Sequence, residues 1–206
     1  MTTRFRGKLR TYARLVSTPL RDESPGYHHV VARGNNKRTI YLDDRDREFF
    51  CLTVNRLAKK YGWTVLAYCL MDNHYHLVLS VSEKGLSDGM CELNSGYART
   101  FNKHHGRVNH LFGKRYWNRR IKTHASMFNV VRYVVQNPRA AGGSLPLEAY
   151  AWTSYAATIG LAYSRIDLAK DELLAFFGST PARAVNEFRM YCSAHCILRP
   201  GRWQPP

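Results

Sequence analysis

The sequence is poor in acidic residues, its five cysteines form no even set, and it has no long hydrophobic run. No window approaches the roughly 18 consecutive apolar residues that would cross a bilayer. The start MTTRFRGKLR lacks the apolar stretch that follows the basic start of a signal peptide. These absences argue against a membrane protein and against an exported one, so we expect a cytoplasmic protein with no membrane partner.

Cysteine is too scarce and too irregularly spaced for a disulfide framework. There are five cysteines, and an odd number cannot pair completely. Cys192 and Cys196, with His195 between them, would need two further zinc ligands that are not evident nearby. Reduced thiols in a cytoplasm are therefore the expected state.

The shortage of acidic residues leaves a large positive charge. Against 15 Asp and Glu stand 31 Lys and Arg, which gives a formal net charge of +16. The basic residues are interleaved with aromatics over several segments and do not form one basic amphipathic helix. This pattern favours nucleic acid over a membrane surface as the partner, the alternative being a soluble protein with a high isoelectric point.

The length of 206 residues predicts one compact domain, or one domain with a small appendage. We divide the chain into a basic N-terminal arm (1–25), a main domain (26–144) and a helical C-terminal extension (145–206). In the main domain, strands are expected at 28–33, 63–71, 74–81 and around 120–123, and helices from Asp43 or Asp44 to Gly62 and at 86–105. Further helices are expected at 125–137, ended by Pro138, and around 168–177 and 182–191.

The order strand, helix, strand, strand, helix, strand is that of a ferredoxin-like fold. The fold class is therefore α+β, an antiparallel sheet with helices on one face. The helix at 125–137 and the C-terminal helices are additions to this plan.

Two histidines begin the third predicted strand. Side chains alternate along a strand, so His74 and His76 share one face while Tyr75 lies on the other. Two imidazoles at the edge of a buried sheet could hold a metal ion rigidly. The alternative is a histidine pair on a solvated sheet face.

The helix at 125–137 carries a polar flank beside its apolar arc. Tyr133 lies on this flank, and Asn137 lies one turn onward with an amide oxygen that could bind a hard cation. Gln136 is the alternative donor, and either amide could instead form hydrogen bonds at the helix end. The tyrosine itself could be an ordinary residue at the top of the core.

Two separated segments resemble a known family. Residues 71–79 (MDNHYHLVL) and 132–142 (RYVVQNPRAAG) are similar to the two signature blocks of the REP-associated tyrosine transposases, the single-tyrosine HUH transposase family. Supporting similarity lies at 29–36, 97–107 and 151–155. The chain departs from the family at Asp72, where proline is usual, and at Arg139-Ala140, where Val-Arg is usual.

The resemblance implies a nuclease that cuts and rejoins single-stranded DNA at hairpins. His74 and His76 would be metal ligands, with Asn137 as our choice of third ligand, and Tyr133 the nucleophile that forms a 5′-phosphotyrosine. A phenol, with an ordinary pKa near 10, is a weak nucleophile at neutral pH and needs a nearby cation. The donors alone are compatible with Mn²⁺, Mg²⁺ or Zn²⁺, and the family favours Mg²⁺ or Mn²⁺.

Basic and aromatic residues outside this constellation are candidates for binding hairpin or single-stranded DNA. Guanidinium groups can hold the backbone while aromatic rings stack on bases. Besides the arm, the candidates are Arg33, Asn35, Lys114, Arg115, Tyr116, Trp117, Arg119 and Arg120. The alternative is that Tyr116 and Trp117 are core residues and only the charges face outward. Either one chain or a homodimer could act.

Two other functions remain open at this stage. One is a non-catalytic, domesticated protein that binds hairpin DNA, which the intact His74, His76 and Tyr133 argue against. The other is a phosphoesterase that pairs this strand with a second element at His124-Ala125-Ser126. It is weak, since Leu77 and Val78 follow His76 where a hydroxyl residue would be needed.

Overall fold

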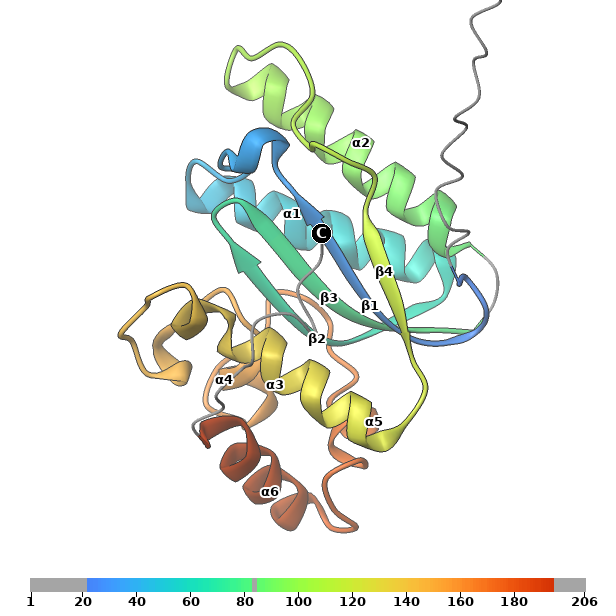
Figure 1. Ribbon diagram of the computed structural model, residues 1–206, viewed down its shortest axis with the longest axis vertical. Helices are drawn as coiled ribbons and strands as arrows, with labels where there is room; N and C mark the ends of the chain where they lie inside the picture. The colour runs from blue at the N-terminus through green and yellow to red at the C-terminus, as the bar shows by residue number, and fades with distance from the viewer. Residues whose placement is uncertain (1–21, 83–84, 195–206) are drawn as a thin grey trace, which may run out of the picture.

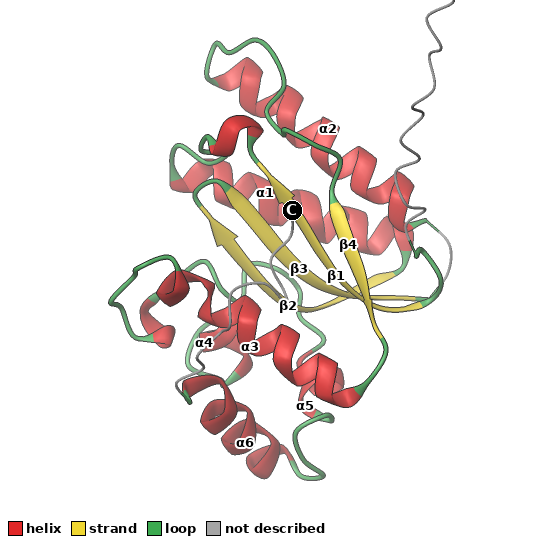
Figure 2. Ribbon diagram, viewed as in Figure 1, coloured by secondary structure: helices red, strands yellow, loops and turns green. Residues whose placement is uncertain are grey.

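The computed structural model describes residues 22–82 and 85–194, in which a four-stranded antiparallel sheet lies between two groups of helices (Figures 1 and 2). The strand order is β2-β3-β1-β4. The strands are β1 (Gly26–Arg33), β2 (Trp63–Met71), β3 (His74–Val81) and β4 (Trp117–Ile121). The predicted ferredoxin-like α+β fold is confirmed. Most of the predicted basic arm, together with His195 and Cys196, lies outside the described residues.

Helices α1 (Asp44–Tyr61) and α2 (Leu86–His104) cover one face of the sheet. Asp43 caps α1 by accepting a hydrogen bond from the Asp46 N–H, and Gly62 ends the helix with φ 65°, a conformation that favours glycine. Buried side chains from both helices pack on the strand residues of this face, including Val30, Tyr75 and Leu77. These contacts form the core of the predicted main domain.

The second face is covered by α3 (His124–Ala140) and the C-terminal helices α4 (Tyr155–Thr158), α5 (Lys170–Leu174) and α6 (Pro181–Ser193). Short 3-10 turns lie at Asn35–Lys37 and Leu147–Ala149. The expectation that Pro138 ends α3 is wrong, because the helix continues to Ala140. Proline so near a helix end sacrifices little more than one backbone hydrogen bond.

The free edge of β2 is covered by the chain that follows α3. The Leu70 N–H donates to the Trp152 carbonyl at 2.9 Å, and the Ala169 N–H donates to the Val65 carbonyl at 2.9 Å. This segment satisfies backbone groups that would otherwise make β2 an open edge.

Within the described ranges, no helix has both the length and the apolar composition needed to cross a membrane.

Strand β4 begins earlier than expected. We placed a strand around 120–123, but pairing with β1 runs from Trp117, opposite Val31, to Ile121, opposite Tyr27. Thr123 instead caps α3 by accepting a hydrogen bond from the Ser126 N–H. The basic run is therefore partly strand, and its side chains alternate between the two sheet faces.

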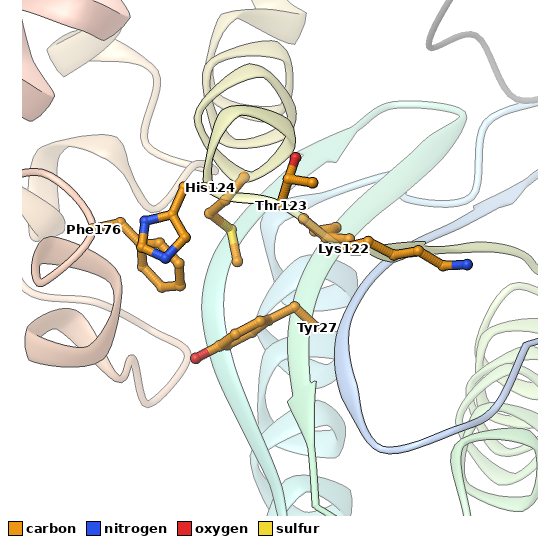
Figure 3. A pocket seen from close by; sticks show the side chains of 7 residues that line it. Tyr27, Lys122, Thr123, His124 and Phe176 are labelled. Carbon is orange, nitrogen blue, oxygen red and sulfur yellow. The ribbon is translucent and has the colours of Figure 1, made fainter.

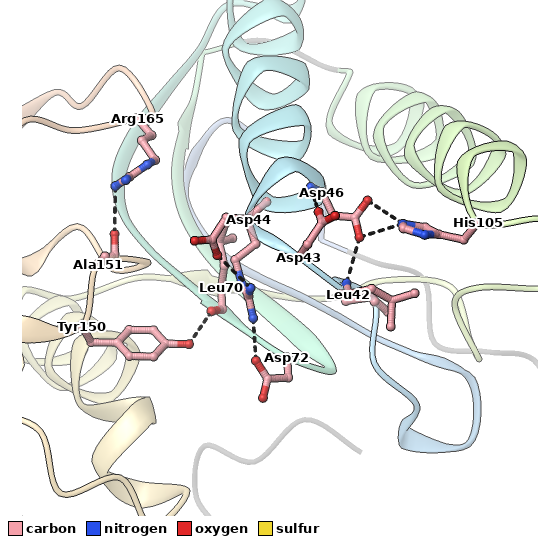
Figure 4. Close-up of polar contacts among 12 residues, drawn as sticks. Leu42, Asp43, Asp44, Asp46, Leu70, Asp72, His105, Tyr150, Ala151 and Arg165 are labelled. Carbon is pink, nitrogen blue, oxygen red and sulfur yellow. Dashed lines mark hydrogen bonds and ion pairs between the residues drawn. The ribbon is translucent and has the colours of Figure 1, made fainter.

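A polar network fixes the start of α1 against α2 and the β2–β3 turn (Figure 4). Asp46 accepts hydrogen bonds from the His105 ring at 2.9 Å and from the Leu42 N–H at 2.8 Å. Arg47 forms an ion pair with Asp72 at 2.6 Å. Asp72, which stands where the similar family usually has proline, thus joins the turn before His74 to α1.

Candidate metal and nucleophile site

The paired histidines face α3. Tyr75 and Leu77 point into the core beneath α1 and α2, so the alternating His74 and His76 point to the other face. Both are buried, and their ring centroids are 4.9 Å apart. The prediction that the two imidazoles share one face is confirmed, whereas the alternative of a solvated pair is wrong.

Tyr133 of α3 lies over this pair. Its ring centroid is 5.4 Å from that of His76 and 6.0 Å from that of His29, both in edge-to-face arrangements. The side chain is half-buried, unlike the fully buried valines of the same helix. The two segments that carry the family resemblance therefore meet across the core.

Asn137 and Gln136 point in different directions, because adjacent residues on a helix are about 100° apart. Asn137 places Oδ1 3.3 Å from His74 Nε2. Gln136 instead donates from Nε2 to the carbonyls of Cys192 at 2.6 Å and Ala194 at 3.1 Å, which anchors the end of α6. Asn137 is thus the amide beside the histidines, and Gln136 is a structural residue.

Two asparagine amides each present an oxygen to one nitrogen of His74, and the shorter of the two contacts favours a proton on Nδ1. Asn73 donates from Nδ2 to the Lys37 carbonyl at 3.1 Å, so its Oδ1, 2.6 Å from His74 Nδ1, must accept. Asn137 likewise donates from Nδ2 to the Tyr133 carbonyl at 3.4 Å, which turns its Oδ1 toward His74. His74 Nε2 then presents a lone pair to an amide oxygen, an arrangement that a cation between them stabilises.

His76 is held by a residue that sequence reasoning did not place in the site. Its Nδ1 is 2.9 Å from Nε2 of His29, and its own Nε2 has no hydrogen-bond partner among the described residues. We had used His29 only as part of a supporting similarity. Its position follows from the pairing of β1 with β3, which local sequence pattern does not reveal.

Burial keeps these imidazoles neutral at neutral pH. Desolvation and the nearby Arg33 guanidinium lower the pKa of His74 to about 4. Desolvation and the neighbouring His29 and His74 hold the pKa of His76 well below its usual range. Desolvation and Arg119 lower the pKa of His29 to about 3. Neutral imidazoles are the form that binds metals.

The donor set fits a hard divalent cation. Ligands at right angles on an octahedral ion with bonds of about 2.1 Å lie about 3 Å apart, close to the 3.3 Å between His74 Nε2 and Asn137 Oδ1. The unpartnered Nε2 of His76 supplies a second imidazole. In residues 22–82 and 85–194, no three His, Cys, Asp or Glu side chains gather as a metal site. The Asn137 amide oxygen is the further donor beside the two imidazoles, and such a donor set is better suited to Mg²⁺ or Mn²⁺ than to a structural zinc ion.

Because side chains alternate along β4, the candidate DNA-binding residues of this segment are divided between the two faces of the sheet. Trp117 lies on the histidine face, with its ring centroid 5.4 Å from that of His29, and Arg119 shares this face and is exposed. Tyr116 is only 5% exposed in the opposite core. Arg120 donates to the Pro25 carbonyl at 2.8 Å. Tyr116 is therefore a core residue, as the alternative interpretation of the sequence had it, and Arg120 lies on the sheet face opposite the histidines.

The other candidates gather at the end of β1. Arg33 is directly opposite His74 in the β1–β3 pairing, and its carbonyl accepts a hydrogen bond from the Gly113 N–H at 3.1 Å. The Asn35 N–H donates to the Leu111 carbonyl at 2.8 Å. These bonds bring the exposed side chains of Lys114 and Arg115 to the same end of the sheet as the histidine pair.

A cavity of about 320 Å³ lies at the start of α3 (Figure 3). Its lining includes Tyr27, Lys122, His124 and Phe176. His124 precedes Asn137 by 13 residues, about 20 Å along the helix, so this cavity is separate from the histidine pair. The phosphoesterase alternative is therefore wrong, because it needs the element around His124 to face His76.

A ferredoxin-like sheet whose His-x-His pair faces a helix-borne tyrosine defines the single-tyrosine HUH class. The comparisons with known proteins agree. Residues 24–137 match the family described as transposase IS200 like, and the chain belongs to this family. No curated protein matches the chain.

One solved structure shows the same fold. A REP-associated tyrosine transposase bound to a REP hairpin is 16% identical, with a TM-score of 0.59 over 73% of this chain and 89% of the other. This structure shows that the fold is shared, and the family match confirms the predicted resemblance to the single-tyrosine transposases. A proposed transposase from Deinococcus radiodurans R1 is 13% identical, with a TM-score of 0.41 over 59% of this chain and 94% of the other.

Proposed function

We propose that this chain is a metal-dependent transposase that cleaves and rejoins single-stranded DNA at hairpin repeats through a 5′-phosphotyrosine intermediate. The observation that carries the proposal is the packing of the Tyr133 ring against His76, 5.4 Å between centroids, beside the amide of Asn137. Membership of the IS200-like transposase family supports DNA transposition as the reaction. The hairpin bound to the similar transposase supports a hairpin substrate.

The side chains of His74, His76 and Asn137 would hold Mg²⁺ or Mn²⁺ through two imidazole nitrogens and one amide oxygen. When bound, the cation supplies Lewis-acid stabilisation of charge on the scissile phosphate. The chain provides rigidity: both imidazoles are buried on one strand, and α3 packs firmly against the sheet through its valines. A preorganised site of this kind limits the reorganisation needed during reaction.

Tyr133 performs the covalent step. Its phenolic oxygen, after losing its proton, attacks phosphorus, so that a bond from phosphorus to the tyrosine oxygen forms and the bond to the 3′-oxygen breaks. The departing strand keeps a 3′-hydroxyl once its oxygen is protonated. A 3′-hydroxyl from a second strand then attacks the phosphotyrosine and releases the phenol. The phosphodiester energy is stored in the intermediate, so rejoining needs no ATP.

Arg33 and Trp117 border the reacting groups. Arg33 lies opposite His74, and its Nε has no hydrogen-bond partner in the described part of the chain, although the atom is buried. A guanidinium there can bind a backbone phosphate beside the scissile bond. Trp117 is half-buried and can offer a ring edge or face to a base, with stacking worth roughly 1–3 kcal/mol.

Substitution of the nucleophile tests this function. With a hairpin-containing single-stranded oligonucleotide and Mn²⁺, we expect Tyr133→Phe to abolish cleavage while binding changes little, because only the hydroxyl is removed. Tyr163→Phe, at a residue 88% exposed, is the matched control and should cleave normally. Cleavage by Tyr133→Phe at the wild-type rate contradicts the mechanism. A wild-type protein that binds the hairpin without cutting it supports the non-catalytic alternative.

A further inference from the structure

His29 and His76 form a buried imidazole pair on neighbouring strands. Both residues are 0% exposed, their rings are stacked with centroids 5.1 Å apart, and His29 Nε2 is 2.9 Å from His76 Nδ1. The two outer nitrogens, His29 Nδ1 and His76 Nε2, have no hydrogen-bond partner among the described residues. Burying polar nitrogens without hydrogen-bond partners costs free energy, so the pair calls for an explanation.

The shared hydrogen bond decides what His76 can bind. A hydrogen bond between two neutral imidazoles contains one proton, donated either by His76 Nδ1 or by His29 Nε2. If His76 donates, its Nε2 keeps a lone pair and can act as a metal ligand. If His29 donates, His76 carries its own proton on Nε2, and that nitrogen cannot bind a cation.

The His29 nitrogen that faces His76 is not available as a metal ligand. Nε2 of His29 is already engaged by His76, and the His29 ring is packed edge-to-face against Trp117 at 5.4 Å. It also contacts the Tyr133 ring, 6.0 Å between centroids. His29 therefore packs against both the proposed ligand His76 and the proposed nucleophile Tyr133.

We propose that His29 is a positioning residue that accepts the hydrogen bond from His76 Nδ1 and so directs the His76 Nε2 lone pair to the metal. The inference rests on the metal site of the proposed function. Asn73 acts on His74 in the same way, because its Oδ1 accepts from Nδ1 at 2.6 Å. Each proposed metal histidine thus has one acceptor at Nδ1 that sets its tautomer and ring orientation.

The test compares two side chains of similar size at position 29. His29→Gln retains a polar group that can accept from His76, whereas His29→Met does not. Mn²⁺ affinity, measured from the free-ion signal in electron paramagnetic resonance, should fall about 10–100-fold in His29→Met and stay within about threefold in His29→Gln. His29→Phe, which keeps a ring stacked on His76, should lose affinity like the methionine variant.

His28 provides the control. It is also 0% exposed on β1, but it faces the opposite side of the sheet and donates from Nε2 to the Ser24 carbonyl at 2.8 Å. His28→Met should leave Mn²⁺ affinity unchanged, with circular dichroism used to confirm that each variant is folded.

Wild-type affinity in folded His29→Met and His29→Phe overturns the proposal, as does equal loss in the glutamine variant. A wild-type protein with no Mn²⁺ affinity instead overturns the metal site itself.

Discussion

At the scale of single residues, the site depends on side-chain amides whose N–H groups are bound to backbone carbonyls. Asn73 donates to the Lys37 carbonyl and Asn137 donates to the Tyr133 carbonyl, which leaves both amide oxygens facing His74. A neutral oxygen donor between imidazoles suits a hard cation that must also accept a phosphate oxygen. The amides therefore hold the orientation of His74 and would determine which cations the proposed metal site prefers.

Truncation of the adjacent amide side chains Asn137 and Gln136 on α3 should have different effects on metal affinity and on stability. Asn137→Ala removes a proposed ligand, and we expect Mn²⁺ affinity to fall at least about tenfold. Gln136→Ala leaves the buried Cys192 carbonyl without its donor, so it should lower the free energy of unfolding by about 1–3 kcal/mol without changing Mn²⁺ affinity. Titration with Mn²⁺ and urea unfolding of both variants check this. Equal loss of metal affinity in the two variants would exclude Asn137 as a ligand.

Strand and helix periodicity was sufficient to place His74, His76 and Tyr133 correctly. A two-residue spacing puts both histidines on one face, and the four-residue spacing puts Asn137 one turn from Tyr133. The role of His29 could not be predicted in the same way, because it depends on which strands are neighbours. Tyr116 and Arg120 were misplaced because the start of β4 was missed, and with it the face of each side chain.

At the scale of elements, the two helices on the first sheet face are joined by one carboxylate. Glu92 of α2 accepts hydrogen bonds from Lys60 at 2.6 Å, Arg56 at 3.0 Å and the Tyr61 hydroxyl at 3.0 Å, all on α1. The hydrogen bonds from Lys60, then Arg56, then Tyr61 lower the pKa of Glu92 to about 2. Its charged form is thus favoured in the folded state.

The lowered pKa makes the contribution of Glu92 to the free energy of unfolding depend on pH. Because its folded pKa lies below the ordinary 4.5, the stabilisation is fully present above pH 4.5 and is lost as the pH falls toward 2. Glu92→Gln should therefore be less stable than wild type at pH 7, by an amount that shrinks between pH 4.5 and 3. Urea unfolding across this range measures the difference, with Glu187→Gln on α6 as an exposed control. A difference independent of pH would contradict the assignment.

At the scale of the whole molecule, the fold determines which faces carry the basic side chains that give the net charge of +16. Arg33, Lys114 and Arg115 lie at the end of the sheet that carries the histidines, whereas Arg120 is turned to the other face and bonded to Pro25. We therefore expect DNA to approach Tyr133 from this basic end of the sheet. Composition predicted a polyanionic partner, but the face that binds it depends on how β4 pairs with β1.

Salt dependence can locate the DNA-binding face. If Lys114 and Arg115 each contact a phosphate of single-stranded DNA, the double variant Lys114→Gln/Arg115→Gln should reduce the slope of log affinity against log salt by about 1.4, or roughly 0.7 per contact. Arg120→Gln should leave the slope unchanged. Fluorescence anisotropy at several salt concentrations provides both values. An equal reduction in the Arg120 variant would place the DNA on the opposite face.

The proposed mechanism requires the Tyr133 oxygen to become covalently bonded to DNA. Wild-type protein, a labelled hairpin oligonucleotide and Mn²⁺ should give a band that resists denaturation in a gel, and peptide mass analysis should locate the nucleotide on Tyr133 through a 5′-phosphate. The band should be absent with Tyr133→Phe or after chelation of the metal. An adduct on another residue, or cleavage without any adduct, would contradict the account.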